Sequence, residues 1–493
     1  MPHSMDSVVF GADITTLLDL TPRDFQDNHY FPLDAQSTWW LPTPDRKILP
    51  LSLSLQQFPF RGPTSFGQRF TFDVPAGCGD LLHNAFLQIE LGHWFDDTSI
   101  CRFQTGQYVY APGQTVWNYA NSLGTVIIEQ AELEVNGITI ERIDGDFIHI
   151  YGLLNQPMQS QYGIQVDGLG RKPFPYSPPQ ASPFPTESGS LCIPLAFFFQ
   201  RIALSEGFHL LAAKPGSVRI HITLRPFSQC VTSSIQPGTN NDTCIFDPTP
   251  LGKSINIIDK GYTLSGSTPK VLTTSVAVPQ FKRIQLITYT SHTDGTMRQA
   301  ILRSPFEILV RNVETFTFTE PLKFSVTGST EDTINVQLPI EINHPMEEII
   351  WVVRRKANAI QNEWTNFSSV TLAEYNPVFN KRRPLLVQAS IYLNGIEIVQ
   401  KEEQWFRQHI CHAHPGGYAA YAEYIYGYSF SRNPGHHQPS GTANASKLQS
   451  VKLNLSVKHP AGEANKEWEV LVYVIRLDWL RFQNGLVSHI YMD

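Results

Sequence analysis

The stretch Gln388-Ala-Ser-Ile-Tyr-Leu-Asn-Gly-Ile-Glu-Ile-Val399 decides the fold, because an earlier copy of it is present in the chain. That copy is Gln130-Ala-Glu-Leu-Glu-Val-Asn-Gly-Ile-Thr-Ile-Glu141. In both copies, apolar residues alternate with others on either side of an Asn-Gly pair, at Asn136-Gly137 and at Asn394-Gly395. Asn and Gly tolerate the positive φ angles that a two-residue hairpin turn requires. Each copy therefore predicts a β-hairpin.

A second pair of matching segments follows in the same order. Ser217-Val-Arg-Ile-His-Ile-Thr-Leu-Arg225 matches Ser450-Val-Lys-Leu-Asn-Leu-Ser-Val-Lys458 in residue class. The hairpin copies lie 258 positions apart (from 136 to 394), and the second pair lies 233 apart (from 217 to 450). Two matches in one order predict a tandem duplication of a whole β domain, not a short-period solenoid. The alternative is that short β patterns look alike by chance.

The length of the chain agrees with two domains. At 493 residues it exceeds one ordinary core, and all-β domains commonly have about 200 to 250 residues. We predict an N-terminal arm at 1–45, a first β-sandwich at 46–227, a polar linker at 228–260 and a second β-sandwich at 261–493. Strand signals in the first unit include 49–58, 68–74, 86–91 and 147–154, and the signal at 284–289 is assigned to the second unit. Long loops are predicted at 156–190, 409–421 and 431–447.

Composition indicates a protein that associates with other protein. Hydrophobic residues make up 42% of the chain and charged residues only 16%, where about 25% is usual. A net charge of −7 argues against direct binding of nucleic acid, which needs clustered Lys and Arg. The short basic runs Arg354-Arg355-Lys356 and Lys381-Arg382-Arg383 are typical of solvated strand ends or loops.

Cysteine usage and the N-terminus bear on the compartment. The six cysteines have no C-x-x-C spacing, which predicts free thiols in a reducing compartment. The N-terminus lacks a basic segment followed by an apolar core, and no run reaches the roughly 18 apolar residues of a membrane helix. We expect a protein that is soluble and intracellular where it is made, without membrane insertion.

Motifs that could carry chemistry are weak. His409, His412 and His414, with Cys411, form the best metal candidate by residue type, but no acidic residue follows until Glu423, so an ordered loop is favoured. The pair Asp144-Gly-Asp146 has the composition of a turn beside a hairpin. Gly252-Lys253-Ser254 lacks the glycine that a phosphate loop needs at position 247. No motif in the sequence therefore predicts catalytic residues, a cofactor or a metal.

Four segments of the chain carry a family resemblance. They are His344-Pro-Met-Glu-Glu-Ile-Ile-Trp-Val-Val353, Asn362-Glu-Trp-Thr-Asn-Phe-Ser368, the Asn394-Gly395 hairpin and the stretch from Tyr428 to Ser446. In this order they resemble the major capsid proteins of nucleocytoplasmic large DNA viruses, over residues 48–493. The element Gln438-Pro-Ser-Gly-Thr-Ala-Asn-Ala-Ser446 is the most specific of them.

This resemblance implies an all-β double jelly-roll: two tandem eight-stranded jelly-roll β-sandwiches with long loops and an N-terminal arm. It implies a homotrimeric capsomer that tiles the icosahedral shell of a large double-stranded DNA virus, made in the host cytoplasm and located in the virion. Expected partners are further copies of the chain and minor capsid and penton proteins, and an internal membrane beneath the shell is compatible with this arrangement. The residues expected to determine fold and assembly are Asn136, Gly137, Asn394, Gly395, Trp351, Trp364, Gln438, Pro439, Ser440, Gly441, Asn444 and Ser446.

Three alternatives remain open on the sequence. A carbohydrate-binding or glycan-processing protein could also be built on two β-sandwiches, and it would need exposed aromatic residues near a carboxylate pair. A metal-dependent jelly-roll enzyme is the second alternative. A minor or paralogous protein of the same particle is the third.

Overall fold

The computed structural model describes twenty stretches of the chain. They are 51–62, 64–75, 77–92, 102–104, 107–109, 115–156, 163–164, 168–170, 189–201, 207–235, 256–258, 261–263, 275–276, 280–319, 333–360, 362–371, 382–414, 423–436, 438–458 and 467–490. By its internal contacts the chain divides into Met1–Pro50 and Leu51–Asp493. The predicted arm at 1–45, most of the predicted loop at 156–190 and the Gly252-Lys253-Ser254 motif lie outside the described residues.

The first β-sandwich consists of two antiparallel four-stranded layers. One has the order β1 (Leu51–Pro59), β16 (Arg283–Thr293), β3 (Leu81–Glu90) and β10 (Phe208–His209). The other has the order β2 (Arg69–Asp73), β11 (Val218–Leu224), β7 (Ile128–Val135) and β8 (Ile138–Asp144). β9 (Ser190–Pro194) also pairs with β3. Burial alternates along β2 and β11, so that every second side chain enters the core, as a period of two requires.

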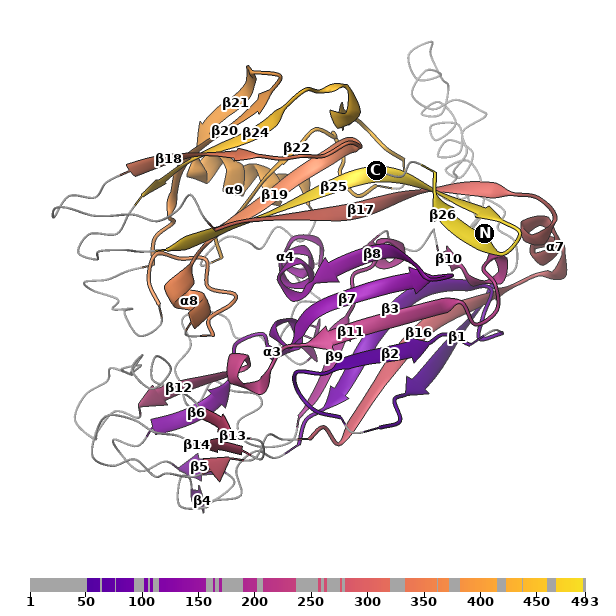
Figure 1. Cartoon of the computed structure of the whole chain (residues 1–493), viewed down its shortest axis with the longest axis horizontal. Helices are drawn as coiled ribbons and strands as arrows, with labels where there is room; N and C mark the ends of the chain where they lie inside the picture. Colours follow the sequence, from indigo (N-terminus) through magenta and orange to yellow (C-terminus); the bar gives the residue numbers. More distant parts are fainter. Residues whose placement is uncertain are drawn as a thin grey trace, which may run out of the picture. The chain divides into compact units, whose positions relative to one another are not determined.

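The second β-sandwich has the same construction. One layer has the order β17 (Phe306–Phe318), β25 (Trp468–Gln483), β19 (Pro345–Arg355) and β22 (Ile425–Ser429). The other has the order β18 (Thr333–Pro339), β24 (Val451–Lys458), β20 (Leu386–Leu393) and β21 (Ile396–Glu402). Two short strands, β23 (Ala443–Asn444) and β26 (Leu486–His489), pair with β19 and β25. Figure 1 shows β18, β24, β20 and β21 as one layer over β17, β25 and β19.

Strand order identifies both sandwiches as jelly rolls. When the eight main strands of each are counted along the chain, one layer has the order 1-8-3-6 and the other 2-7-4-5, in the first sandwich and again in the second. Eight strands in two such sheets form a jelly roll. The predicted fold class, a double jelly-roll built by duplication, is confirmed.

The duplication extends to irregularities of the backbone. β7 and β8 form the first predicted hairpin, and their register slips so that Ile140 has no partner on β7. β20 and β21 form the second hairpin, and their register slips in the same way at Ile398, 258 positions later. The second matched pair of segments forms β11 and β24, which occupy the same place in their sheets. A β-bulge repeated at one position identifies corresponding residues of the two sandwiches.

Three assignments made from the sequence are wrong. β16 was placed in the second domain (261–493), but it pairs with β1 and β3, so the first jelly roll ends at Thr293 and the predicted linker lies within it. The apolar run 147–154 is part of helix α4 (Gly145–Asn155), not a strand, because Asp144 caps the first turn. The segment from 409 to 413 belongs to helix α9 (Glu403–Ala413), which packs through Phe406 and Ile410, and is not a loop.

The remaining elements are short. The helices are α3 (Leu123–Val126), α5 (Phe198–Arg201), α7 (Gly295–Arg303) and α8 (Lys356–Ile360), with the 3-10 turns η2 (Leu210–Ala212), η3 (Phe227–Gln229) and η5 (Ala445–Lys447). Small sheets are formed by β4 (Arg102–Gln104), β5 (Gln107–Val109), β6 (Thr115–Tyr119), β12 (Val231–Ile235), β13 (Asn256–Ile258), β14 (Gly261–Thr263) and β15 (Ser275–Val276). None of the helices among the described residues is long and apolar enough to cross a membrane.

Candidate functional site

Both Asn-Gly turns have the backbone that the sequence predicts. The φ angles are 54° at Asn136, 81° at Gly137, 53° at Asn394 and 80° at Gly395. Positive φ at both central residues matches a tight two-residue hairpin. A Cβ added to Gly137 or Gly395 would meet no atom within 4 Å, so the backbone angle, and not crowding, requires glycine there.

Replacing Gly395 by Val is expected to destabilise the fold by about 1–3 kcal/mol, because a β-branched residue is strained at positive φ. Gly395→Asn is the matched control, since Asn tolerates that region, and it should remain close to the wild type. Urea unfolding followed by circular dichroism compares the two variants. Wild-type stability of the Val variant would contradict the hairpin's role as a fold determinant.

The two turns bind different parts of the molecule. Nδ2 of Asn136 donates to the carbonyl oxygen of Gly485, in the turn between β25 and β26, at 3.1 Å. Oδ1 of Asn394 instead accepts from the backbone N–H groups of Gln449, at 2.6 Å, and Ser450, at 3.3 Å. The first turn therefore joins the two jelly rolls, whereas the second is tied within its own jelly roll.

A buried polar cluster holds the two jelly rolls together. Nη1 of Arg354, on β19, lies 3.2 Å from both carboxylate oxygens of Asp146, on α4. Arg225 approaches the same carboxylate at 3.6 Å. The hydroxyl of Tyr473, on β25, donates to Asp144 Oδ1 at 3.1 Å, and the ring of Tyr473 lies 5.4 Å from that of Phe147. The N-cap and first turn of α4 thus bind the outer face of the second jelly roll.

The two carboxylates of this cluster titrate in opposite directions. Burial, together with the nearby negative charge of Asp146, raises the pKa of Asp144 to about 6. Burial also opposes ionisation of Asp146, but the charges of Arg354 and Arg225 outweigh it, so the pKa of Asp146 lies below its ordinary value. Asp146 is therefore the ionised partner of the arginines, and Asp144 serves as the helix cap.

Asp144→Asn is expected to make stability less dependent on pH. Because the folded state binds the Asp144 proton more tightly than the unfolded chain, the contribution of Asp144 to stability is greatest below pH 4 and declines as pH rises through about 6. Asn keeps the cap and removes that decline. The thermal midpoint of the variant, relative to wild type, should therefore rise between pH 4 and pH 7. Asp146→Asn should change in the opposite sense and at lower pH, because the stability that Asp146 contributes is lost only as pH falls below about 4. Equal pH profiles for all three proteins would contradict the assignment.

Trp364 lies between two arginines from different jelly rolls. The guanidinium carbon of Arg225 is 4.0 Å from the centre of its ring, and that of Arg354 is 5.1 Å away. Nε1 of Trp364 donates to the carbonyl oxygen of Gln229 at 2.9 Å. Cation–π contact with a desolvated guanidinium contributes on the order of 2 kcal/mol. The residue singled out in the sequence thus belongs to the contact between the jelly rolls.

Asn362, in the same motif as Trp364, binds the first jelly roll directly. Its Nδ2 donates to the carbonyl oxygens of Ser228 and Val231, both at 2.7 Å. Its φ is 62°, a backbone conformation that Asn adopts more readily than most residues. The motif that begins at Asn362 therefore packs against the segment from Ser228 to Val231, where β12 begins.

Trp351 lies in the core of the second jelly roll, not in the contact between the two. Its side chain is fully buried on β19. Its ring is 5.1 Å from that of Phe406, on α9, and is stacked 6.1 Å from that of Tyr426. Trp351 therefore holds helix α9 against the sheet, and its role is in folding.

The segment 438–446 is a surface loop with an ordered backbone. Ser440 Oγ is 2.6 Å from Ser431 Oγ and accepts from the N–H of Asn433 at 2.8 Å. Gly441 has a φ of 145°, and a Cβ there would lie 2.8 Å from the carbonyl oxygen of Phe430. Only glycine fits this position without a shift of the backbone.

The end of this loop is attached to the edge of β19. Asn444 pairs with Pro345 as part of β23, and its side chain accepts a hydrogen bond from the hydroxyl of Ser446. Gln438 is exposed and Pro439 half-buried. The loop therefore presents a fixed polar surface, and its role in assembly stays a prediction.

The histidine cluster in the sequence does not form a metal site. His414 is buried, with Nε2 2.8 Å from Glu348 Oε1 and Nδ1 2.9 Å from Asn155 Oδ1, at the end of α4. Burial opposes its protonation, but Glu348 outweighs it and raises the pKa of His414. His409 instead stacks on Trp405. In the part of the chain that the structure describes, no three His, Cys, Asp or Glu side chains are grouped to hold a metal ion.

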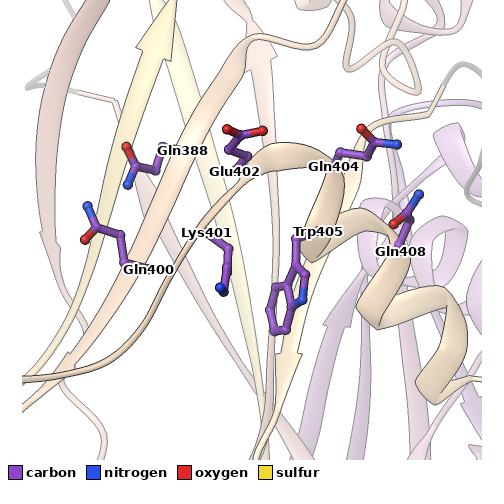
Figure 2. Close-up of a pocket in the computed structure, with 7 residues that line it drawn as sticks. All are labelled: Gln388, Gln400, Lys401, Glu402, Gln404, Trp405 and Gln408. Atoms are coloured by element: carbon purple, nitrogen blue, oxygen red, sulfur yellow. The ribbon is translucent and has the colours of Figure 1, made fainter.

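A shallow hollow of about 510 Å³ lies where α9 follows the second hairpin. Figure 2 shows Trp405 beside Lys401 and Glu402, with side chains of the strands on one side and of the helix on the other. The residues that line it are Gln388, Gln400, Lys401, Glu402, Gln404, Trp405 and Gln408. It has a half-buried aromatic residue but one carboxylate, not the pair that glycan cleavage requires.

Sequence reasoning missed the contact between the jelly rolls. Arg354 and Arg355 were expected to be solvated but are 3% and 2% exposed, and the Asp144-Gly-Asp146 pair was interpreted as a turn. One signal in the sequence could have indicated this contact. Two arginines directly follow the apolar run of β19, and charged residues next to such a run are buried only when they have a partner. The partners Asp146, Arg225 and Tyr473 come from distant segments, which no local pattern indicates.

Comparisons with known proteins agree on one family. A family model described as the N-terminus of major capsid proteins matches residues 53–259, and one described as the large eukaryotic DNA virus major capsid protein matches residues 298–488. The major capsid protein of Pyramimonas orientalis virus is 22% identical over 439 residues, which cover 87% of either chain.

Two solved structures share the fold. The PBCV-1 virus capsid model has a TM-score of 0.63 at 16% identity, and the match covers 92% of this chain and 100% of that chain. The Faustovirus major capsid protein has a TM-score of 0.62 at 12% identity, over 97% of this chain and 99% of that chain.

Proposed function

Since this chain belongs to the major capsid proteins of large eukaryotic DNA viruses, which are structural proteins of the virion capsid and not enzymes, we propose that three copies of it form one capsomer. Each capsomer has a pseudo-hexagonal outline and tiles the flat faces of an icosahedral shell. Further proposed partners are the minor capsid and penton proteins. The proposed place of synthesis is the host cytoplasm.

The duplication supports this proposal. The chain consists of two jelly rolls with the same strand order, so a closed ring of three chains presents six similar units around its axis. A heterologous contact that closes after three copies forms such a ring. A near-sixfold outline lets identical capsomers pack on a flat lattice.

Composition supports extensive association. Only 16% of the residues are charged, and obligate interfaces are poor in charge and bury more than about 2,000 Å². Large apolar side chains are exposed on several strands, including Leu53, Ile396 and Ile398. Exposed apolar clusters on a soluble protein indicate interaction sites.

Size exclusion with light scattering on the purified chain tests the proposal. The expected mass is three times the 55.6 kDa of one chain. A monomer that binds or cleaves glycans would contradict the proposal and favour the alternative of a carbohydrate-active protein.

A further inference from the structure

The two hairpins and the helices that follow them correspond residue by residue. The β-bulge at Ile140 recurs at Ile398. Helices α4 and α9 follow their hairpins directly and have 11 residues each. With the same spacing of 258 positions, Phe147 corresponds to Trp405.

These corresponding positions differ sharply in burial. Ile140 is 4% exposed, whereas Ile398, the same residue at the same bulge, is 44% exposed. Phe147 is fully buried and Trp405 only half-buried. Most of α4 is buried, but α9 buries only Phe406 and Ile410. Equal backbones with unequal burial indicate that a neighbour covers one copy and not the other.

The neighbour of the first hairpin is the second jelly roll. β8 contacts β17 and β26, and Nε2 of His489 lies 3.1 Å from the carbonyl oxygen of Ile140. The second hairpin has no such cover among the described residues. Its strand β21 is exposed along nearly its whole length, including Ile396 at 67%.

The sheet that covers the first hairpin has a counterpart too. β19 is buried on both faces, because α4 lies on its outer side. The corresponding strand, β3, alternates between buried and half-buried residues, so only one of its faces is covered. Both strands carry a register slip against the last strand of their jelly roll, at His83 and at Glu347. Counted from these slips, Phe86 of the first jelly roll corresponds to Ile350 of the second, and their strand partners Ile287 and Tyr473 correspond to each other.

The uncovered outer face of the first jelly roll is apolar. Leu53 is 63% exposed, Leu55 47% and Tyr289 39%. Leu55 and Tyr289 are opposite each other in the register of β1 and β16, so they lie on one face. The ring of Phe86 lies 5.8 Å from that of Tyr289. We call this set of residues on β1, β16 and β3 the outer patch, and Ile396, Ile398 and Trp405 the edge patch.

We propose that the edge patch of one copy packs on the outer patch of a second copy, in the same way that the first hairpin packs on the second jelly roll within the chain. The inference rests on the proposed trimer and assigns its surfaces. It joins unlike patches, so each copy uses its edge patch on one neighbour and its outer patch on the other. Three such contacts close the ring.

The absence of like-charge repulsion favours this pairing. Within the chain, Asp146 binds Arg354. In the proposed contact, Gln404 corresponds to Asp146 and Glu90 corresponds to Arg354. A neutral amide and a carboxylate can share a hydrogen bond. If the first hairpin docked on the outer patch instead, Asp146 would face Glu90, and like charges brought together cost several kcal/mol. The hollow that Trp405, Gln404 and Gln408 line together with residues of the second hairpin (Figure 2) gives space for side chains of the second copy.

Two charge substitutions test the contact. Ile398→Asp blocks the edge patch and Leu55→Asp blocks the outer patch, and each variant alone is expected to fall from three chains to one in light scattering. An equimolar mixture is expected to form a dimer, because the intact edge patch of the Leu55→Asp chain can bind the intact outer patch of the Ile398→Asp chain. Leu302→Asp, at a residue 63% exposed on α7, is the matched control and should remain a trimer. Circular dichroism and thermal melting show that each variant is folded.

The outcomes separate this inference from the proposed function. A wild-type chain that is not a trimer contradicts the capsomer itself. A trimeric wild type with trimeric Ile398→Asp and Leu55→Asp variants keeps the capsomer and overturns the assigned surfaces. Folded monomeric variants whose mixture stays monomeric also overturn the pairing of unlike patches.

Discussion

Arg354→Met is expected to lower the free energy of unfolding by about 3–5 kcal/mol, because it leaves the buried carboxylate of Asp146 without its main partner. Arg354 is 3% exposed, binds Asp146 and Glu469, and donates to the carbonyl oxygen of Trp364 at 2.9 Å. Met keeps most of the volume and removes the charge. Chemical denaturation measures the loss.

An exposed ion pair provides the control. The side chains of Arg481 and Glu307 are 49% and 40% exposed, so Arg481→Met should cost only about 0–1 kcal/mol. The double variant Arg354→Met/Asp146→Asn removes the isolated carboxylate and is expected to recover part of the loss. Equal effects of Arg354→Met and Arg481→Met would show that the buried cluster does not hold the jelly rolls together.

Trp351→Ala is expected to cost about 3–5 kcal/mol, since it removes a fully buried indole and leaves a cavity beneath α9. The rings of Phe406 and Tyr426 that contact it would lose their packing partner. Trp479, which is 40% exposed, supplies the matched control, and Trp479→Ala should stay close to wild type. Urea denaturation of both variants checks the difference, and similar midpoints would place Trp351 outside the core.

The buried cluster and the proposed contact are two versions of one interface. Inside the chain, the interface is permanent and contains the Asp146–Arg354 ion pair and the hydrogen bond from Asn136 to Gly485. In the proposed contact between chains, the corresponding positions are Gln404 and Glu90, which form no ion pair. Truncating one partner of a buried charge pair is costly, so the internal contact tolerates less change than the contact between copies.

Features of the fold that depend on neighbouring residues could be predicted from the sequence, and features that depend on tertiary contacts could not. The hairpins at Asn136-Gly137 and Asn394-Gly395 were predictable, because the turn needs positive φ at adjacent residues and the strands alternate locally. The duplication was predictable from the spacing of those hairpins. The helical state of 147–154 was missed, since tertiary packing of an apolar run outweighs its local pattern.

Assignment of β16 failed for a related reason. An apolar strand signal at 284–289 does not say which sheet the strand joins, and polar residues at 228–260 favoured a domain boundary. Pairing with β1 and β3 is a long-range choice, made by burial of Ile284 and Leu286 in the first core. Strand partners are set by the whole core and not by neighbours in the sequence.

By itself, then, the sequence determined the all-β class, the twofold repetition and the family, because turn chemistry and alternation act over a few residues and survive duplication. Only the tertiary structure decided that α4 is mostly buried and α9 only partly buried, and that Arg354 and Asp146 meet. The physical reason is that two nearly equal units in one chain have unequal neighbours: the second jelly roll covers the edge of the first, whereas its own edge strand, β21, is exposed among the residues that the structure describes.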